Sequence, residues 1–230
     1  MKNISACVLL LLSVFFSCHA QEPYFCTTPG TSLSYNRYDS QTGKLTQTTL
    51  LEIKSVKPWN GGRRIEYFMT LKKANGKDMF GGRTAQSVYV DADGNSHWNL
   101  AATVTGLIKN YLKRADVSSR GDISLLPATL TPGDTLPEVH CELFWGKFRL
   151  TIDVIQRQVL RKETITTPAG TFNCTVVRER KTENAPLHHW DHVSDNWYVQ
   201  GIGYVRHDVY NDDMQVMYSE ILWSIGDSNP

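Results

Sequence analysis

The residues with the clearest potential for chemistry are three histidines close together in the C-terminal part of the chain. His188, His189 and His192 fall within five residues, with Asp191 among them. Neutral imidazoles bind Zn²⁺, Ni²⁺ or Cu²⁺ well, so a loop could turn three such rings toward one ion. The sequence favours the alternative, a polar loop after Pro186 without a special role, because no distant ligand motif accompanies the cluster. The histidines are therefore weak candidates for metal ligands, and we expect no cofactor.

Motifs for catalysis or nucleotide binding are missing from the chain. The sequence contains no G-x-S-x-G elbow, no H-E-x-x-H pair, no G-x-x-x-x-G-K-[ST] loop and no dinucleotide fingerprint. A pair of carboxylates for glycosidic chemistry is not visible in a sequence, because such residues meet only in the fold. We therefore expect a non-enzymatic protein without catalytic residues, and an envelope hydrolase is the least favoured alternative.

The first twenty residues have the anatomy of a secretory signal peptide. Lys2 gives a positive start, residues 8–16 (VLLLLSVFF) form an apolar run, and small residues precede Gln21. The run is too short to span a bilayer, so the pattern predicts export and cleavage between Ala20 and Gln21. The alternative is a lipobox that ends at Cys18 and anchors the chain through an acylated cysteine. Cleavage after Ala20 is favoured, because the two phenylalanines of the run occupy positions where a lipobox prefers an aliphatic and a small residue.

The expected mature chain, residues 21–230, is formally neutral, since excluding Lys2 leaves as many basic as acidic residues. Without a basic stripe it has no electrostatic footprint for nucleic acid or for an anionic membrane surface. It also has no second apolar segment of membrane length, so we expect no transmembrane helix. The predicted location is the periplasm or the cell envelope.

Three cysteines remain in the expected mature chain: Cys26, Cys141 and Cys174. They are too scattered along the sequence to suggest a zinc site, which needs clustered ligands. In an oxidising compartment, three cysteines are enough for one disulfide and one free thiol. The residues alone do not decide which pair forms.

Most of the mature sequence alternates β-type runs with turn signals, which is typical of an antiparallel β-protein. Asn75-Gly76 and Asp93-Gly94 lie between such runs, and pairs of this kind favour hairpins because type I′ turns need positive φ. The segment Leu100–Leu112 differs, because its apolar residues recur at helical spacing along one face. We therefore predict a mainly β fold with one amphipathic helix around residues 100–113. No linker or composition shift divides the chain, so residues 21–230 are predicted to form a single domain.

Aromatic residues are frequent, and Trp98, Trp190 and Trp197 are among them. Such side chains suit the interior of a curved sheet, and they also line apolar ligand cavities. Core packing is the favoured interpretation, with a ligand cavity as the alternative. The sequence does not identify the residues that would bind a ligand.

Two segments resemble a known family. Residues 163–174 (ETITTPAGTFNC) are close to its "ETVTTPAGTFDC" segment, and residues 197–206 (WYVQGIGYVR) are similar to its "WYAKGVGVVR" segment. Residues 29–45 also resemble the start of that family. On these motifs the chain is identified as a member of the DUF3108-like group of exported proteins of Gram-negative bacteria, also called TapB-like. The similarity spans most of the mature chain.

The resemblance implies a curved antiparallel sheet that forms a half-barrel or open barrel, in the manner of periplasmic lipoprotein carriers. It brings no catalytic residues. It also implies a disulfide between Cys26 and Cys174, which would leave Cys141 as a buried free thiol. Pairing of Cys141 with Cys174 is the alternative.

Four residues in the two matching segments have a structural interpretation. Pro168 restricts φ and Gly170 permits a tight approach, so the strand after them would start at a defined angle. Gly201 and Gly203 indicate a bulge or bend where a strand curves sharply. These residues would shape a sheet, and they supply no reactive group.

Together these features predict an exported, non-enzymatic binding protein or carrier for an apolar small molecule or lipid. The alternative is a structural or interaction module that docks an envelope protein on an exposed edge strand. A filled core with a long unpaired edge would favour the module. A deep cavity would favour the carrier.

Overall fold

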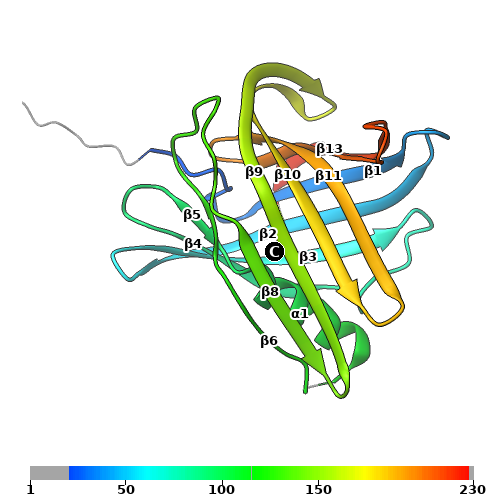
Figure 1. Cartoon of the computed structure of the whole chain (residues 1–230). Coiled ribbons are helices and arrows are strands. Elements are labelled where there is room, and N and C mark those ends of the chain that lie inside the picture. Colours follow the sequence, from blue (N-terminus) through cyan, green and yellow to red (C-terminus); the bar gives the residue numbers. More distant parts are fainter. Residues whose placement is uncertain (1–20, 115, 228–230) are drawn as a thin grey trace, which may run out of the picture.

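The computed structural model describes residues 21–114 and 116–227, which form a curved sheet and a single helix (Figure 1). The predicted signal peptide, residues 1–20, and the alternative lipid-anchor site at Cys18 lie outside the described residues. No helix in the described ranges has the length and hydrophobicity needed to cross a bilayer.

The described strands belong to one sheet of thirteen, and all their pairings are antiparallel. In chain order they are β1 (Thr31–Asp39), β2 (Leu45–Trp59), β3 (Gly62–Lys73), β4 (Thr84–Val90), β5 (Ser96–Trp98), β6 (Ser118–Gly121), β7 (Ser124–Leu126), β8 (Val139–Trp145), β9 (Phe148–Thr167), β10 (Gly170–Ala185), β11 (His188–Val199), β12 (Gly203–Tyr210) and β13 (Val216–Asp227). Their order in the sheet is β6-β8-β9-β10-β11-β12-β13-β1-β2-β3-β4-β5-β7.

The sheet curls until its two edges approach each other. The edge strands β6 and β7 lie at opposite ends of the strand order, yet only Asp122 and Ile123 separate them in the chain. Figure 1 shows β1, β2 and β3 crossing behind β9, β10 and β11, so the sheet wraps around an interior. The edge strands do not pair with each other, and the sheet is not closed into a barrel. The predicted curved, open antiparallel sheet is therefore confirmed.

The helix α1 (Leu100–Leu112) matches the predicted segment. Asn99 caps it, because its side-chain Oδ1 accepts a hydrogen bond from the Ala102 backbone N–H at 2.8 Å. The helix contacts β4 near one end of the sheet and β6 and β8 near the other. Its residues Leu100, Val104 and Ile108 pack against apolar side chains of β8 and β9. One face of α1 thus joins the two ends of the curled sheet.

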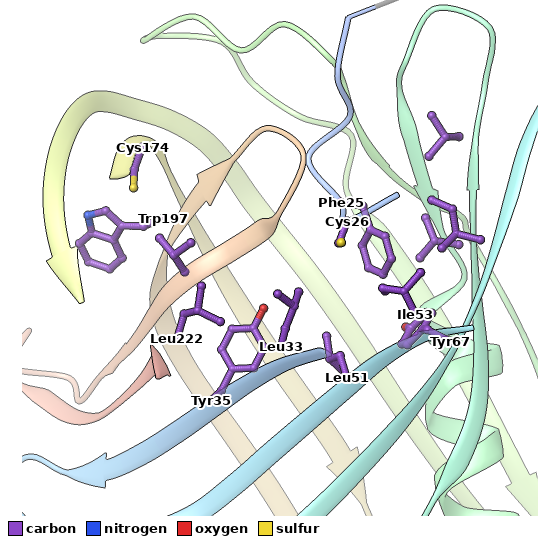
Figure 2. Packing of buried hydrophobic residues seen from close by; sticks show 14 of the residues in the cluster. Phe25, Cys26, Leu33, Tyr35, Leu51, Ile53, Tyr67, Cys174, Trp197 and Leu222 are labelled. Atoms are coloured by element: carbon purple, nitrogen blue, oxygen red, sulfur yellow. The ribbon is translucent and has the colours of Figure 1, made fainter. Parts of the chain in front are cut away.

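The interior is apolar at one end and polar at the other. Alternate residues of each strand face inward, and the inward row changes character along the strand. On β1, Leu33 and Tyr35 lie in the main apolar cluster (Figure 2), whereas Arg37 lines a cavity. On β13, Leu222 belongs to the same cluster and Glu220 lines the cavity. The apolar end provides the packed core, and the polar end is hollow.

A β-bulge in β9 directs one more charged side chain into the polar end. The register between β10 and β9 shifts so that Glu179 faces two β9 residues, Gln156 and Arg157. Gln156 adopts a left-handed φ of 53°, which is uncommon outside glycine. Bulges of this kind re-aim side chains. As a result Arg157 is buried, whereas its neighbours Gln156 and Gln158 are exposed.

Candidate ligand-binding cavity

A cavity of about 350 Å³ lies within the curled sheet, at the polar end of the interior. Strand β11 supplies more of its wall than any other element, and β1, β5, β7, β8, β9, β10, β12, β13 and α1 complete it. The volume falls at the lower end of the range for pockets that hold small molecules.

Five alternate residues of β11 line the cavity: Trp190, His192, Ser194, Asn196 and Tyr198. Residues two positions apart on a strand point to the same face, so the row is continuous. The sequence suggested a polar loop for the first half of this segment and did not reveal the row. Residues 190–198 (WDHVSDNWY) show no regular alternation of apolar and polar side chains that could have indicated it.

Glu220 is the centre of a hydrogen-bonded group beside this row. Arg37 donates from Nη2 to Glu220 Oε2 at 2.9 Å, and the Thr49 hydroxyl donates to Oε1 at 2.6 Å. The Arg37 guanidinium also lies 4.5 Å from the centroid of the Tyr218 ring. Burial disfavours the charge of Arg37, but the attraction and hydrogen bond of Glu220 outweigh it and raise the pKa of the guanidinium. The Arg37 guanidinium is therefore held in its charged form beside Glu220.

Two histidines in the wall are neutral at physiological pH. Burial is the main cause that lowers the pKa of His207 and of His192 to about 4. His207 Nδ1 lies 2.7 Å from Asn196 Oδ1, and the neutral ring donates this hydrogen bond. The His192 ring packs on Trp190 with 4.1 Å between centroids.

Several lining residues present a buried polar atom that has no hydrogen-bond partner in the described part of the chain. These atoms are Arg37 Nε, Arg157 Nε, His192 Nδ1, Ser194 Oγ and Asn196 Nδ2. Arg157 Nε has a 3.5 Å contact with Glu179, which is long for a hydrogen bond. An unsatisfied buried group costs about 1–3 kcal/mol, so folded proteins contain few of them. Five such atoms around one cavity indicate that a polar ligand can bind there.

A small apolar branch leads from the cavity toward the packed core. It has a volume of about 40 Å³, and Phe25, Leu51 and Leu126 are among its lining residues. The branch and the main cavity share Trp98 and Tyr198 in their walls, so the two spaces lie next to each other. The sequence predicted aromatic residues either in the core or around a ligand cavity, and these two side chains line the cavity.

The three candidate metal ligands do not converge. The region predicted as a loop is the start of β11, which pairs with β10 as far as the bridge between Ala185 and His188. On a strand, His189 points to the opposite face from His188 and His192, and His188 is exposed. Within residues 21–114 and 116–227, no group of three His, Cys, Asp or Glu side chains is placed to hold a metal ion.

The cysteines Cys26, Cys141 and Cys174 are buried free thiols in this structure, so the implied Cys26–Cys174 disulfide is not formed here. Figure 2 shows Cys174 beside Trp197 and Cys26 beside Phe25, on different sides of the apolar cluster. The Cys174 thiol lies 3.6 Å from the carbonyl of Phe172 on its own strand. Both residues are buried in the main apolar cluster.

The four predicted turn residues lie at two hairpins. Pro168 is in the connection between β9 and β10, and Gly170 is the first residue of β10, with a φ of 142°. Gly201 has a φ of 75° in the connection between β11 and β12, and Gly203 starts β12 with a φ of 111°. The second pair thus serves a turn between two strands, whereas the sequence suggested a bend within one strand.

Comparison with known proteins agrees with the fold. A protein of Bacteroides fragilis NCTC 9343, described as exported with a YmcC-like fold, is 24% identical over 90% of this chain and 100% of that chain, with a TM-score of 0.73. A protein of Parabacteroides distasonis ATCC 8503, described as a lipoprotein, is 18% identical over 89% of this chain and 99% of that chain, also with a TM-score of 0.73. None of the curated proteins matches the sequence.

These two identities are low, so the likeness to the solved structures establishes the fold alone. Membership of a family follows from the sequence. Residues 28–222 match the family description "DUF3108-like", and this range includes both motif segments and most of the sheet. The chain belongs to the DUF3108-like family.

Proposed function

We propose that this protein is a non-enzymatic binding protein of the cell envelope that holds one small molecule in the cavity beneath β11. The observation that carries the proposal is the set of buried polar atoms on His192, Ser194 and Asn196 that have no hydrogen-bond partner in the described part of the chain. Folding removes these groups from water without giving them a partner, and a bound molecule would supply the missing hydrogen bonds.

The polar lining of the cavity changes the expected ligand from an apolar molecule to one that is partly polar. An apolar molecule or lipid would leave the polar atoms of the wall unpaired. The cavity of about 350 Å³ combines these atoms with the aromatic side chains Trp98, Trp190 and Tyr218. Binding sites typically join apolar walls with a few polar groups that fix orientation. The ligand therefore has a polar part and an apolar part.

The edges of the sheet favour this proposal over a docking module. A partner that adds a strand needs a long edge with free backbone groups. The two edge strands are four residues long (β6) and three residues long (β7). The cavity and the short edges both support a carrier.

The reactive groups of the interior favour binding over catalysis. Both carboxylate oxygens of Glu220 already accept hydrogen bonds, from Arg37 and from Thr49. Burial raises the pKa of the Cys141 and Cys174 thiols to about 11, so few thiolates exist at neutral pH.

The envelope location rests on two supports. The N-terminal segment has the pattern of a signal peptide. Both solved relatives are described as an exported protein or a lipoprotein. Fractionation of the native host, with an antibody against this protein, would test the location directly.

Native mass spectrometry of the protein purified from its own host tests the binding function. We expect a complex with one small molecule that is lost on denaturation. Ser194→Phe would place a ring in the cavity and abolish the added mass, whereas Ser224→Phe at an exposed position of β13 would retain it. Thermal unfolding shows whether both variants are folded. Wild-type protein without any added mass, and without affinity for a panel of small amphiphiles, would refute the proposal.

A further inference from the structure

Resting on the proposed function, we infer that the ligand is an amphiphilic monocarboxylate with a short or medium chain. Its carboxylate would accept hydrogen bonds from Ser194 and Asn196, and its apolar end would point into the branch beside Phe25 and Leu126. The polar end, the charge and the length of the ligand each follow from a different feature of the cavity.

The unpartnered atoms of the wall are mainly donors. Asn196 Nδ2 and the Nε atoms of Arg37 and Arg157 can only donate, and the Ser194 hydroxyl can donate as well. The acceptor Asn196 Oδ1 is already used by His207. A ligand that satisfies these atoms must bring acceptors, so an ammonium group is excluded and a carboxylate fits.

The positions of Ser194 and Asn196 suit one carboxylate. The two residues are 1% and 6% exposed, and they face the cavity from the same side of β11. Residues two positions apart on a strand are separated by about 7 Å. A carboxylate between their side chains can accept one hydrogen bond of about 2.9 Å from each.

The charges of the wall limit the ligand to one negative charge. Arg37, Arg157 and Lys181 are positive, and Glu179 and Glu220 are negative. Lys181 also contacts Glu183 at 2.6 Å, so the charges around the cavity are close to balanced. A phosphate monoester, with a charge near −2, would be poorly compensated in this buried site. A monocarboxylate brings only one negative charge, which the hydrogen-bond donors of the wall can stabilise.

The volume limits the length of the apolar part. The branch beside Phe25 and Leu126 has about 40 Å³, which is space for about one group the size of a water molecule. Only the end of a chain can enter it. The rest would lie in the main cavity against Trp98 and Tyr198, which border both spaces. A long-chain lipid exceeds this space.

Isothermal titration calorimetry with defined probes tests the inference on the full mature chain after ligand removal. We expect octanoate to bind with a 1:1 stoichiometry, at least tenfold more tightly than octanol, octylamine, inorganic phosphate, glucose or palmitate. Fluorescence should change on binding, because Trp98 and Trp190 line the cavity.

Two variant pairs separate recognition of the carboxylate from folding. Asn196→Asp replaces a donor by a negative charge, and we expect it to weaken octanoate binding at least tenfold, whereas Asn173→Asp at an exposed position of β10 should not. Ser194→Ala should weaken binding about tenfold, and Ser224→Ala should leave it unchanged. Thermal unfolding of each variant shows that the fold is retained, and Ser194→Ala provides the test if the buried charge of Asn196→Asp prevents folding.

The outcomes distinguish the inference from the proposed function. The inference of a monocarboxylate ligand is wrong if octanol or glucose binds as tightly as octanoate. It is also wrong if neither Asn196→Asp nor Ser194→Ala weakens octanoate binding. In both cases the proposed function as a small-molecule carrier still holds. Absence of binding by every probe, together with native protein that carries no ligand, would overturn both.

Discussion

Lowering the pH from about 7.5 to about 5 should destabilise the fold through two histidines in the cavity wall. Burial holds the pKa of His207 and His192 at about 4, below their ordinary value of 6.5. The unfolded chain exposes both rings, so it binds protons at a higher pH than the folded protein does. The stability is therefore fully present above pH 6.5 and is lost as the pH falls toward 4.

The size of the effect follows from the shift. A difference of about 2.5 pKa units corresponds to about 3 kcal/mol for each histidine, and about 2 kcal/mol of this is lost at pH 5. Burial is the largest cause for His207, and neighbouring charges act in both directions. Glu220 favours the charged ring, whereas Arg37, His192 and Lys181 disfavour it. The sign of the effect is therefore set by burial.

Urea unfolding at several pH values, followed by tryptophan fluorescence, measures this loss. His207→Gln and His192→Gln should each flatten the dependence on pH, and His189→Gln, at an exposed position of the β10–β11 hairpin, should leave it unchanged. Carboxylates with lowered pKa values, such as Asp91 and Asp191, lose their contribution below this range. A flat profile for the wild-type protein between pH 7.5 and 5 would refute the reasoning, as would an unchanged slope in the double variant.

Further substitutions test the packing and the ion pairs by equilibrium unfolding. Glu220→Ala should cost about 2–3 kcal/mol, because it leaves the half-buried Arg37 without its partner, whereas Glu52→Ala in a more exposed pair should cost about 1 kcal/mol or less. Leu33→Ala should cost about 2–5 kcal/mol in the packed core, and Leu187→Ala in the exposed turn should be neutral; equal costs would contradict the assigned core. Ser194→Ala should leave the stability unchanged or higher, because its hydroxyl has no partner in the described chain, and a loss above about 1 kcal/mol would show a hydrogen bond that the structure does not contain.

The elements with a strong local pattern could be predicted from the sequence. The helix Leu100–Leu112 matches the predicted segment, and the turn pairs Asn75-Gly76 and Asp93-Gly94 each lie between two paired strands. Their periodicity and their turn residues act within a few positions, so the information is local. The start of β11 at His188 could not be recognised in this way, because residues 188–195 show no regular alternation of apolar and polar side chains. Their strand is stabilised by pairing with β10, which depends on the fold.

The sequence by itself determined the class of the protein: a neutral chain with a signal-peptide pattern, the rhythm of antiparallel strands and two family motifs. Only the tertiary structure decided that the interior has a polar end. Arg37, Arg157, Asn196 and Glu220 lie far apart in the sequence, and they meet because the register and curl of the sheet bring β1, β9, β11 and β13 around one space. The bulge at Gln156 adds the guanidinium of Arg157 to that space. The alternation of side chains along each strand indicates which residues share a face. The pairing of distant strands then decides which of these faces enclose a cavity.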